Sequence, residues 1–287
     1  MRASITGFAL ILIVVGVVGG DVAARGATVQ PDFSAATFTP GAPIDNPYFS
    51  QVPGTVRRYE ANVRDPDDPA AEPEALVIEE TVTPQFETVA GVQARVVRAR
   101  EFVDGLLVEH TRDFYAQDAD GNVWYLGEDT TAFEYGDEGN PTGTSTAGSW
   151  RAGVDGAQGG FIMPADLTIG FNYFQENAPA DGALDQATIL GFRDNVTVPA
   201  GTFDDVLDTL EFTTLEEGSE EHKLYAEGVG LVLIEEDLDE AGVPLNAIPL
   251  VSVTGGGGNV IPLPPAIVPG LAMLIGVGAP WVRRRWR

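Results

Sequence analysis

From residue 75 to residue 254 the chain alternates apolar and polar positions in short runs that are separated by turn residues. In the first run Leu76, Ile78 and Val82 share one face of an extended chain, whereas Glu79 and Thr81 fall on the other. A period of two indicates a half-buried β-strand, because successive side chains of a strand point to opposite faces. No stretch here keeps a helical period of 3.6. We therefore expect a domain that is mainly β.

Two Asp-Gly pairs connect neighbouring runs. Asp104-Gly105 lies between residues 92–103 and residues 106–119, and Asp120-Gly121 leads into residues 122–127. An Asp-Gly pair between alternating runs is the strongest local signal for a β-hairpin. The three runs are thus predicted to form an antiparallel meander.

Further strands are predicted on both sides of this meander. They cover residues 56–63, 171–177, 184–190, 193–198, 203–214, 221–225, 228–238 and 250–253. Residues 136–148 are rich in Gly, Thr and Ser and are expected to be a long loop, and no element is predicted over the glycine-containing residues 153–160. Residues 28–53 carry Phe33, Phe38, Tyr48 and Phe49, which are expected to hold an extended segment on the core. The predicted fold is one antiparallel meander domain with long loops, shaped as a curved sheet, a half-barrel or a sandwich.

The first residues have the pattern of a secretory signal peptide. Arg2 precedes an apolar run over residues 5–18, and small residues follow at positions 23, 24, 26 and 27. We expect residues 1–27 to form a signal helix that is cleaved after export. The alternative is an uncleaved N-terminal anchor. Because the chain has no cysteine, it lacks the residue on which a lipoprotein anchor is built.

The last residues combine a Gly linker, an apolar run and a basic end. Residues 255–259 form the linker, and the apolar run covers residues 266–282. At about 1.5 Å per residue this run reaches about 25 Å, short for a hydrocarbon core of about 30 Å. A membrane-stop cluster follows, made of Arg283, Arg284, Arg285 and Arg287. By the positive-inside rule it keeps the C-terminus cytoplasmic and places the β-domain outside.

A short motif precedes the apolar run. Its residues are Val260, Pro262, Leu263, Pro264, Pro265 and Ala266, with Ile261 after the valine. Together with the run and the arginines, it resembles the PEP-CTERM class of bacterial sorting signals in its Val-Pro-Leu-Pro-Ala variant. The resemblance implies processing by an exosortase-like membrane protease after passage through the secretion translocon. It also implies a transient stay in the inner membrane and association with exopolysaccharide. The alternative is an ordinary C-terminal membrane anchor.

A second resemblance concerns the middle of the chain. Residues 196–204, Val-Thr-Val-Pro-Ala-Gly-Thr-Phe-Asp, and residues 225–232, Tyr-Ala-Glu-Gly-Val-Gly-Leu-Val, resemble segments of uncharacterised exported bacterial β-domains. It implies an antiparallel β-fold and assigns no catalytic residue.

The charge balance limits the classes of partner. Lys and Arg total 16 against 43 Asp and Glu, so the formal net charge is −27. Such a field repels nucleic acid and anionic lipid and attracts cations. Lys223 is the only lysine. The absence of cysteine excludes disulfides and thiolate chemistry.

Few residues qualify as candidate sites. His110 and His222 lack the spacing of a zinc site, which needs three or four converging ligands. Asp118, Asp120 and Asn122 alternate as in a calcium loop, but the glycine stands at the fourth position and not at the sixth, so a hairpin turn is favoured. No catalytic, cofactor-binding or metal-binding residue is therefore assigned.

Four arginines cluster on two adjacent predicted strands, at positions 95, 98, 100 and 112. We expect them to pair across the strands with carboxylates such as Glu101, Glu109 and Asp113. An anion-binding patch is the alternative. Carboxylates are too numerous for any two to be named as a glycosidase pair.

The sequence thus predicts an exported protein, anchored in the envelope or released at the surface, with four parts. These are a signal peptide (1–27), an antiparallel β-domain (28–254), a Gly linker (255–259) and a sorting signal (260–287). The β-domain is expected to be non-enzymatic and to need no cofactor. The alternatives are a binding module for an apolar ligand or calcium, and a secreted hydrolase.

Overall fold

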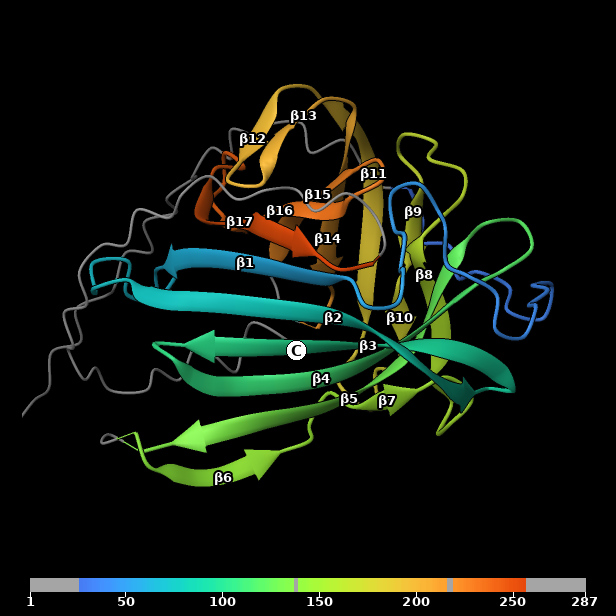
Figure 1. Cartoon of the computed structure of the whole chain (residues 1–287), viewed down its shortest axis with the longest axis horizontal. Coiled ribbons are helices and arrows are strands. Elements are labelled where there is room, and N and C mark those ends of the chain that lie inside the picture. Colours follow the sequence, from blue (N-terminus) through green and yellow to red (C-terminus); the bar gives the residue numbers. More distant parts are fainter. Residues whose placement is uncertain (1–25, 137–138, 216–218, 257–287) are drawn as a thin grey trace, which may run out of the picture.

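The computed structural model describes residues 26–136, 139–215 and 219–256. These residues form strands and connecting segments without any helix, which confirms the prediction of a mainly β domain (Figure 1). Over the same ranges no helix has the length and apolar character needed to cross a membrane. The predicted signal peptide, except for residues 26 and 27, and the whole sorting signal lie outside the described residues.

The strands follow one another closely along the chain. They are β1 (Val56–Val63), β2 (Glu74–Val89), β3 (Val92–Val103), β4 (Leu106–Gln117), β5 (Val123–Tyr135), β6 (Pro141–Ser145), β7 (Trp150–Arg151), β8 (Gln158–Met163), β9 (Asn172–Phe174), β10 (Glu176–Asn177), β11 (Asp185–Arg193), β12 (Val196–Val198), β13 (Gly201–Phe203), β14 (Val206–Thr213), β15 (Glu220–Ala226), β16 (Gly230–Leu238) and β17 (Pro244–Thr254).

Almost all strands belong to one antiparallel sheet. Its order is β10-β8-β5-β4-β3-β2-β1-β17-β16-β15-β14-β11-β9, with β6 and β7 paired to β5. Most neighbours are consecutive in the chain, as in a meander. The pairing that spans most of the chain joins the first strand to the last: Val56 of β1 lies opposite Thr254 of β17. Strands β12 and β13 form a separate hairpin that sits beside β16 and β17 (Figure 1).

The sheet curves until its two end strands meet. β9 pairs with β11 and β10 pairs with β8, yet only Gln175 separates β9 from β10 in the chain. The backbone N–H of Gln175 donates to the carbonyl of Asp185 at 2.8 Å. One extended segment therefore joins both ends of the sheet, and the curved-sheet prediction holds as a nearly closed, barrel-like sheet.

The predicted hairpins are confirmed. Val103 pairs with Leu106 across Asp104 and Gly105, whose φ angles are 48° and 81°. Two consecutive positive φ angles are those of the type I′ turn, which matches the twist of the strands that it joins. The turn at Asp120-Gly121 connects β4 to β5, although β5 continues well past the predicted end at residue 127.

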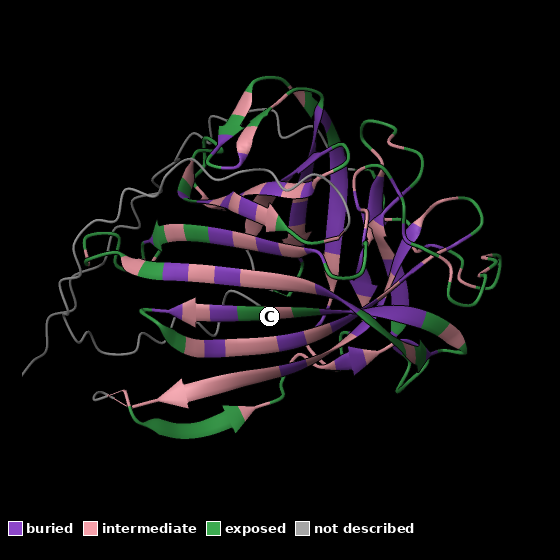
Figure 2. Ribbon diagram, in the orientation of Figure 1, coloured by how far each residue is buried: buried purple, intermediate pink, exposed green. Residues whose placement is uncertain are grey.

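The expected loop over residues 136–148 is wrong in part, because β6 lies within it. β6 pairs with the far half of β5 through Ala132 opposite Ser145 and Phe133 opposite Thr144. It is an exposed edge strand (Figure 2). Its backbone pairing requires no apolar face, so its Gly-Thr-Ser composition carried no strand signal.

The N-terminal segment packs on the sheet through its aromatic residues, as predicted. Phe33 contacts Trp124 edge-on with ring centroids 5.3 Å apart, and Phe38 contacts the same ring at 6.1 Å. Phe49 lies against Tyr115 at 5.1 Å. Trp124 is fully buried, so Phe33 and Phe38 complete the core on the outer side of the meander, whereas Phe49 reaches its inner side.

Candidate functional site

The sheet encloses a cavity of about 410 Å³. Side chains of β1 to β5, β11 and β14 to β16 line it. The lining also includes Pro66, Asp67 and Ser219, which are exposed, so the cavity reaches the molecular surface. Pockets of about 300–1,000 Å³ are typical of small-molecule sites. The cavity is therefore large enough to hold a ligand.

Strand alternation places polar side chains inside. On β4 the lining residues are Glu109, Thr111, Asp113 and Tyr115, which are every second residue of the strand. β15 repeats the pattern with Glu221, Lys223 and Tyr225, and β14 adds Glu211 and Thr213. The period of two that predicted these strands thus also builds a polar interior.

One part of the lining is a neutralised ionic cluster around Lys223. Its Nζ lies 2.8 Å from Oε2 of Glu211 and 3.0 Å from Oε1 of Glu221. Burial alone would lower the pKa of Lys223, but the two carboxylates outweigh it and raise that pKa well above its ordinary value. The hydroxyls of Tyr225 and Thr209 each donate to Oε1 of Glu211 at 3.2 Å. Lys223 therefore remains an ammonium ion within a satisfied network.

Arg57 neutralises a second carboxylate. Its guanidinium pairs with Glu80 and donates to the carbonyls of Ser50 at 2.7 Å and Val229 at 3.1 Å. The residue is only 4% exposed. Because its donors reach the loop before β1 as well as β2 and the turn before β16, Arg57 fixes these segments relative to one another.

Two carboxyl groups in the cavity, those of Glu109 and Asp113, accept hydrogen bonds from hydroxyl groups. On Glu109, Oε1 accepts a hydrogen bond from the hydroxyl of Thr111 at 3.0 Å, and on Asp113, Oδ1 accepts one from Tyr125 at 2.8 Å. Burial, with Glu101 nearby, raises the pKa of Glu109 to about 8.

Asp113 and Glu128 respond to the same environment. Burial raises the pKa of Asp113 to about 7, and Glu80 adds to the effect. Burial, with Asp113 and Glu109 nearby, raises the pKa of Glu128 well above its usual range. These buried acids repel one another's negative charge, so protons remain on part of them near neutral pH.

Glu176 and Asp185 make a further acidic pair where the sheet closes. Their carboxyl groups share a hydrogen bond, which requires a proton on one of them. Burial raises the pKa of Asp185 to about 6 and that of Glu176 well above its ordinary value. The acidic lining therefore extends from β4 and β5 across to β10 and β11.

Aromatic rings lie among these carboxyl groups. Tyr115 and Tyr125 stack with centroids 5.0 Å apart, and Phe49 packs edge-on against Tyr115. Tyr59 and Tyr225 also line the cavity. Burial raises the pKa of Tyr115 and Tyr125 well above 10, so their phenols stay protonated. The wall thus offers π faces and carboxyl groups side by side.

Gln175 presents an unused donor to the cavity. Its side chain lines the cavity and the residue is only 3% exposed, but Nε2 has no hydrogen-bond partner among the described residues. A buried amide donor without an acceptor costs about 1–3 kcal/mol of stability. The backbone of this residue is held by Asp185, so the donor is fixed at the closure of the sheet.

The lining is not arranged as a metal site. Within the described parts of the chain, no group of three or more His, Asp or Glu side chains is placed to hold a metal ion. The calcium-loop pattern is a hairpin turn, as favoured. Asp118 Oδ1 accepts from the backbone N–H groups of Asp120 and Asn122, and Oδ2 accepts from Trp124 Nε1 at 2.8 Å. Its oxygens therefore already stabilise the turn.

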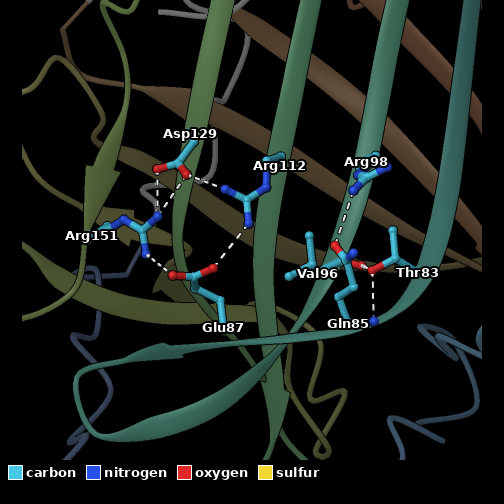
Figure 3. Close-up of polar contacts among 8 residues, drawn as sticks. All are labelled: Thr83, Gln85, Glu87, Val96, Arg98, Arg112, Asp129 and Arg151. Atoms are coloured by element: carbon cyan, nitrogen blue, oxygen red, sulfur yellow. Dashed lines mark hydrogen bonds and ion pairs between the residues drawn. The ribbon is translucent and has the colours of Figure 1, made fainter.

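Arg98 and Arg112 lie on the outer face of the sheet, opposite to Asp113, and Arg151 lies on the same face (Figure 3). Arg112 bridges Asp129 at 2.9 Å and Glu87 at 3.1 Å, and Arg151 bridges the same two carboxylates at 2.7 and 3.6 Å. Both guanidinium groups also lie over the ring of Phe114. Cross-strand pairing is therefore confirmed for Arg112, as a four-membered ring of charges.

Glu109 and Asp113 are not the partners of these arginines, so that part of the prediction is wrong. They lie on the other face of β4 and line the cavity, because odd and even positions of the strand point in opposite directions. The remaining arginines use other acceptors: Arg100 pairs with Glu79, Arg98 donates to Gln85, and Arg95 donates to the carbonyl of Thr83.

The histidines do not converge. His110 is half-buried on β4, where burial, with Arg98 nearby, lowers its pKa. His222 is on β15, and its Nδ1 lies 2.7 Å from Oδ1 of Asp208. Both occupy structural positions, as expected.

The sequence-predicted sorting motif and the membrane-stop cluster lie outside the described residues. The sequence reasoning missed the carboxyl-rich cavity. A signal was present in Glu-x-Thr-x-Asp at residues 109–113, because its alternate face carries Phe114, which is fully buried. When the opposite face of a strand carries a buried side chain such as Phe114, the row of polar side chains on the first face need not face bulk water.

No protein-family model matches the chain, and no curated protein matches it. Two solved structures are similar. One is a protein from Bacteroides fragilis described as exported and as having a YmcC-like fold; it is 12% identical, with 76% of this chain and 99% of that chain covered and a TM-score of 0.36. The other, from Parabacteroides distasonis, is described as a lipoprotein; it is 14% identical with the same coverage and TM-score. Similarities this weak support no conclusion about this chain.

Proposed function

We propose that this chain is an exported, non-catalytic binding protein whose β-domain holds a small hydrophilic ligand in its interior cavity. Exosortase-type processing then leaves it anchored in the envelope or released at the surface. The cavity supports the binding role, and the two end segments of the sequence support export and processing.

The observation that carries the binding role is the polar character of an enclosed space. Burying carboxyl groups without basic partners costs several kcal/mol, and apolar residues of similar volume would stabilise the fold more. Glu109, Asp113 and Gln175 are nevertheless arranged around one cavity of about 410 Å³. A lining of this kind suits a ligand that forms hydrogen bonds. Apolar side chains such as Ile78 and Leu231 also line the cavity, so the ligand presents apolar surface beside its hydrogen-bonding groups.

The binding role is tested with a panel of sugars, amino acids, organic cations and organic acids. Each compound is added to the full-length protein and the shift in melting temperature is measured. A ligand at 100 times its Kd stabilises by about 2.7 kcal/mol, which is roughly 5–10 °C for a domain of this size.

A variant with a filled cavity provides the matched comparison. Ala99→Phe places a ring in the lining, whereas Ala119→Phe places the same ring on the exposed β4–β5 turn. We expect the ligand to stabilise the parent protein and Ala119→Phe but not Ala99→Phe. A panel without any saturable binder, or equal binding by both variants, would refute the role.

Processing is tested by measuring the intact mass of the protein from cells with and without an exosortase. We expect the mature C-terminus to lie near Ala266 when the exosortase is present. A chain that still ends at Arg287 in both strains would reduce the sorting signal to a simple anchor.

A further inference from the structure

Carboxyl groups and aromatic rings lie together on one side of the cavity. The carboxyl groups of Glu109, Asp113 and Glu128 come from adjacent strands, β4 and β5. Asp113 accepts a hydrogen bond from the hydroxyl of Tyr125, whose ring stacks on Tyr115. Carboxyl groups attract a cation, and the face of an aromatic ring attracts it as well, most of all when water is excluded.

The unused donor of Gln175 adds a separate requirement. Nε2 of this buried amide lines the same cavity, and no acceptor in the described part of the chain lies within hydrogen-bond distance of it. Only an acceptor can satisfy this donor. A ligand with an oxygen atom would do so. The acidic groups therefore favour a positively charged ligand, and Gln175 requires an oxygen acceptor on that ligand.

Resting on the ligand-binding role proposed above, we infer that the ligand is a small organic ammonium ion that carries an oxygen acceptor. Its cationic group lies between Glu109, Asp113 and the ring of Tyr125, and its oxygen accepts from Nε2 of Gln175. The described lining lacks the arrangement of ligands that a bare metal ion would need. The formal net charge of −27 draws cations toward the molecule in general.

Binding of such a cation is linked to protons. Charged and titratable groups face Glu109, Asp113 and Glu128 from several strands. They are Glu101 on β3, the Arg57–Glu80 pair on β1 and β2, Lys223 with Glu211 and Glu221 across the cavity, and Glu176 with Asp185 at the closure of the sheet. Arg57 and Lys223 are already paired with carboxylates. The positive charge of an incoming cation is therefore balanced by the loss of protons from the three acids. The affinity therefore rises as the pH rises.

The test uses choline and two matched analogues with the full-length protein. 3,3-Dimethylbutan-1-ol has the shape and hydroxyl of choline without its charge, and tetramethylammonium has the charge without the hydroxyl. Binding is measured by titration calorimetry at pH 6 and pH 8. If one proton leaves for each cation bound, the affinity rises by up to about tenfold per pH unit below the pKa of the acid.

We expect choline to bind more tightly at pH 8 than at pH 6 and to release protons in buffers of different ionisation enthalpy. The neutral alcohol should bind at least about tenfold more weakly, since a desolvated cation over an aromatic ring gains about 2 kcal/mol or more. Tetramethylammonium should also bind more weakly than choline. Equal affinity for choline and the neutral alcohol overturns the cationic assignment. Equal affinity for choline and tetramethylammonium overturns the role of Gln175.

Two isosteric variants locate the site. Glu109→Gln and Asp113→Asn keep the acceptors for Thr111 and Tyr125 and should each weaken choline binding about tenfold or more. Asp155→Asn removes the same charge from an exposed turn outside the cavity and should change nothing. An equal loss in all three variants would mean that only the net charge matters, which overturns the site.

The remaining outcomes separate the two proposals. If none of the three probes binds but a sugar or an organic acid of the wider panel does, the ammonium assignment fails and the binding role stands. If no compound of either set binds, both fail. Calcium that binds and displaces choline would replace the organic cation with a metal ion and overturn the inference.

Discussion

The buried carboxyl group of Glu109 makes the stability of the fold depend on pH in an unusual direction. Burial raises its pKa from 4.5 to about 8 in the folded protein. Between these two values the folded state binds more protons than the unfolded state, so the free energy of unfolding falls as the pH rises. The contribution of Glu109 is fully present below about pH 4.5 and is lost above about pH 8.

The size of the effect follows from the pKa. Each tenfold change in proton affinity corresponds to about 1.4 kcal/mol. For a group moved from 4.5 to about 8, linkage gives a loss on the order of 3 kcal/mol between pH 5 and pH 8. That is a large part of the 5–15 kcal/mol that stabilises an ordinary domain.

Glu109→Gln keeps the shape of the side chain and removes its titration. We expect the variant to be more stable than the parent protein at pH 8, by on the order of 3 kcal/mol, and nearly equal to it at pH 5. Urea unfolding at constant ionic strength measures the difference, with the fluorescence of the buried Trp124 and Trp150 as the probe. At an m-value of 1–3 kcal/mol/M the midpoint at pH 8 should rise by about 1–3 M.

The comparison between variants isolates Glu109. His110 acts in the opposite direction, because burial lowers its pKa and its contribution to stability grows as the pH rises. It is present in both proteins and cancels in their difference. Parallel pH profiles for the parent protein and Glu109→Gln would show that Glu109 is not held in a desolvated cavity, and would refute the reasoning.

Three further predictions concern other parts of the sheet. Lys223→Met leaves Glu211 buried without its base and should destabilise by about 3–5 kcal/mol at pH 8, with a smaller loss at pH 5, where protons replace the ammonium; an equal loss in urea unfolding at both values would contradict this. Gly160→Ala should destabilise by about 2–4 kcal/mol, because the added Cβ would overlap the carbonyl oxygen of Phe174; a melting temperature within 1–2 °C of the parent would contradict that close approach. Arg151→Ala removes one half-exposed member of the outer charge ring and should cost less than about 1 kcal/mol, so a larger loss in urea unfolding would show that the ring supports the fold.

Local patterns predicted the fold well because the turns and the strand alternation are encoded locally. The Asp104-Gly105 and Asp120-Gly121 turns are where the sequence placed them, and Leu76, Ile78 and Val82 share the inner face of β2. Closure of the sheet was not predictable in the same way. It depends on Gln175, where a very short segment pairs with strands on both sides, and such pairing leaves no periodic signal in the sequence.

The site escaped prediction because alternation does not say which face is inside. Glu109 and Asp113 were expected to meet arginines, since a polar row on a strand ordinarily faces solvent. In this fold the outer face of β4 carries Phe114 beneath the arginines, and the inner face carries the acids. Only the curvature of the whole sheet decides this, and curvature is a property of many strands together.

The pairing of β1 with β17 bears on how the protein can mature. A chain that emerges from a translocon N-terminus first can form most of its hairpins as they appear, but β1 must wait for residues 250–254 before its second edge is covered. Contacts this distant in sequence make folding slow, and until they form, the open edge of β1 can pair with other chains. If residues 266–282 stop translocation as proposed, they would hold the last strand, which ends at residue 254, near the membrane at that moment. Completion of the fold and arrest of secretion would then fall at the same step.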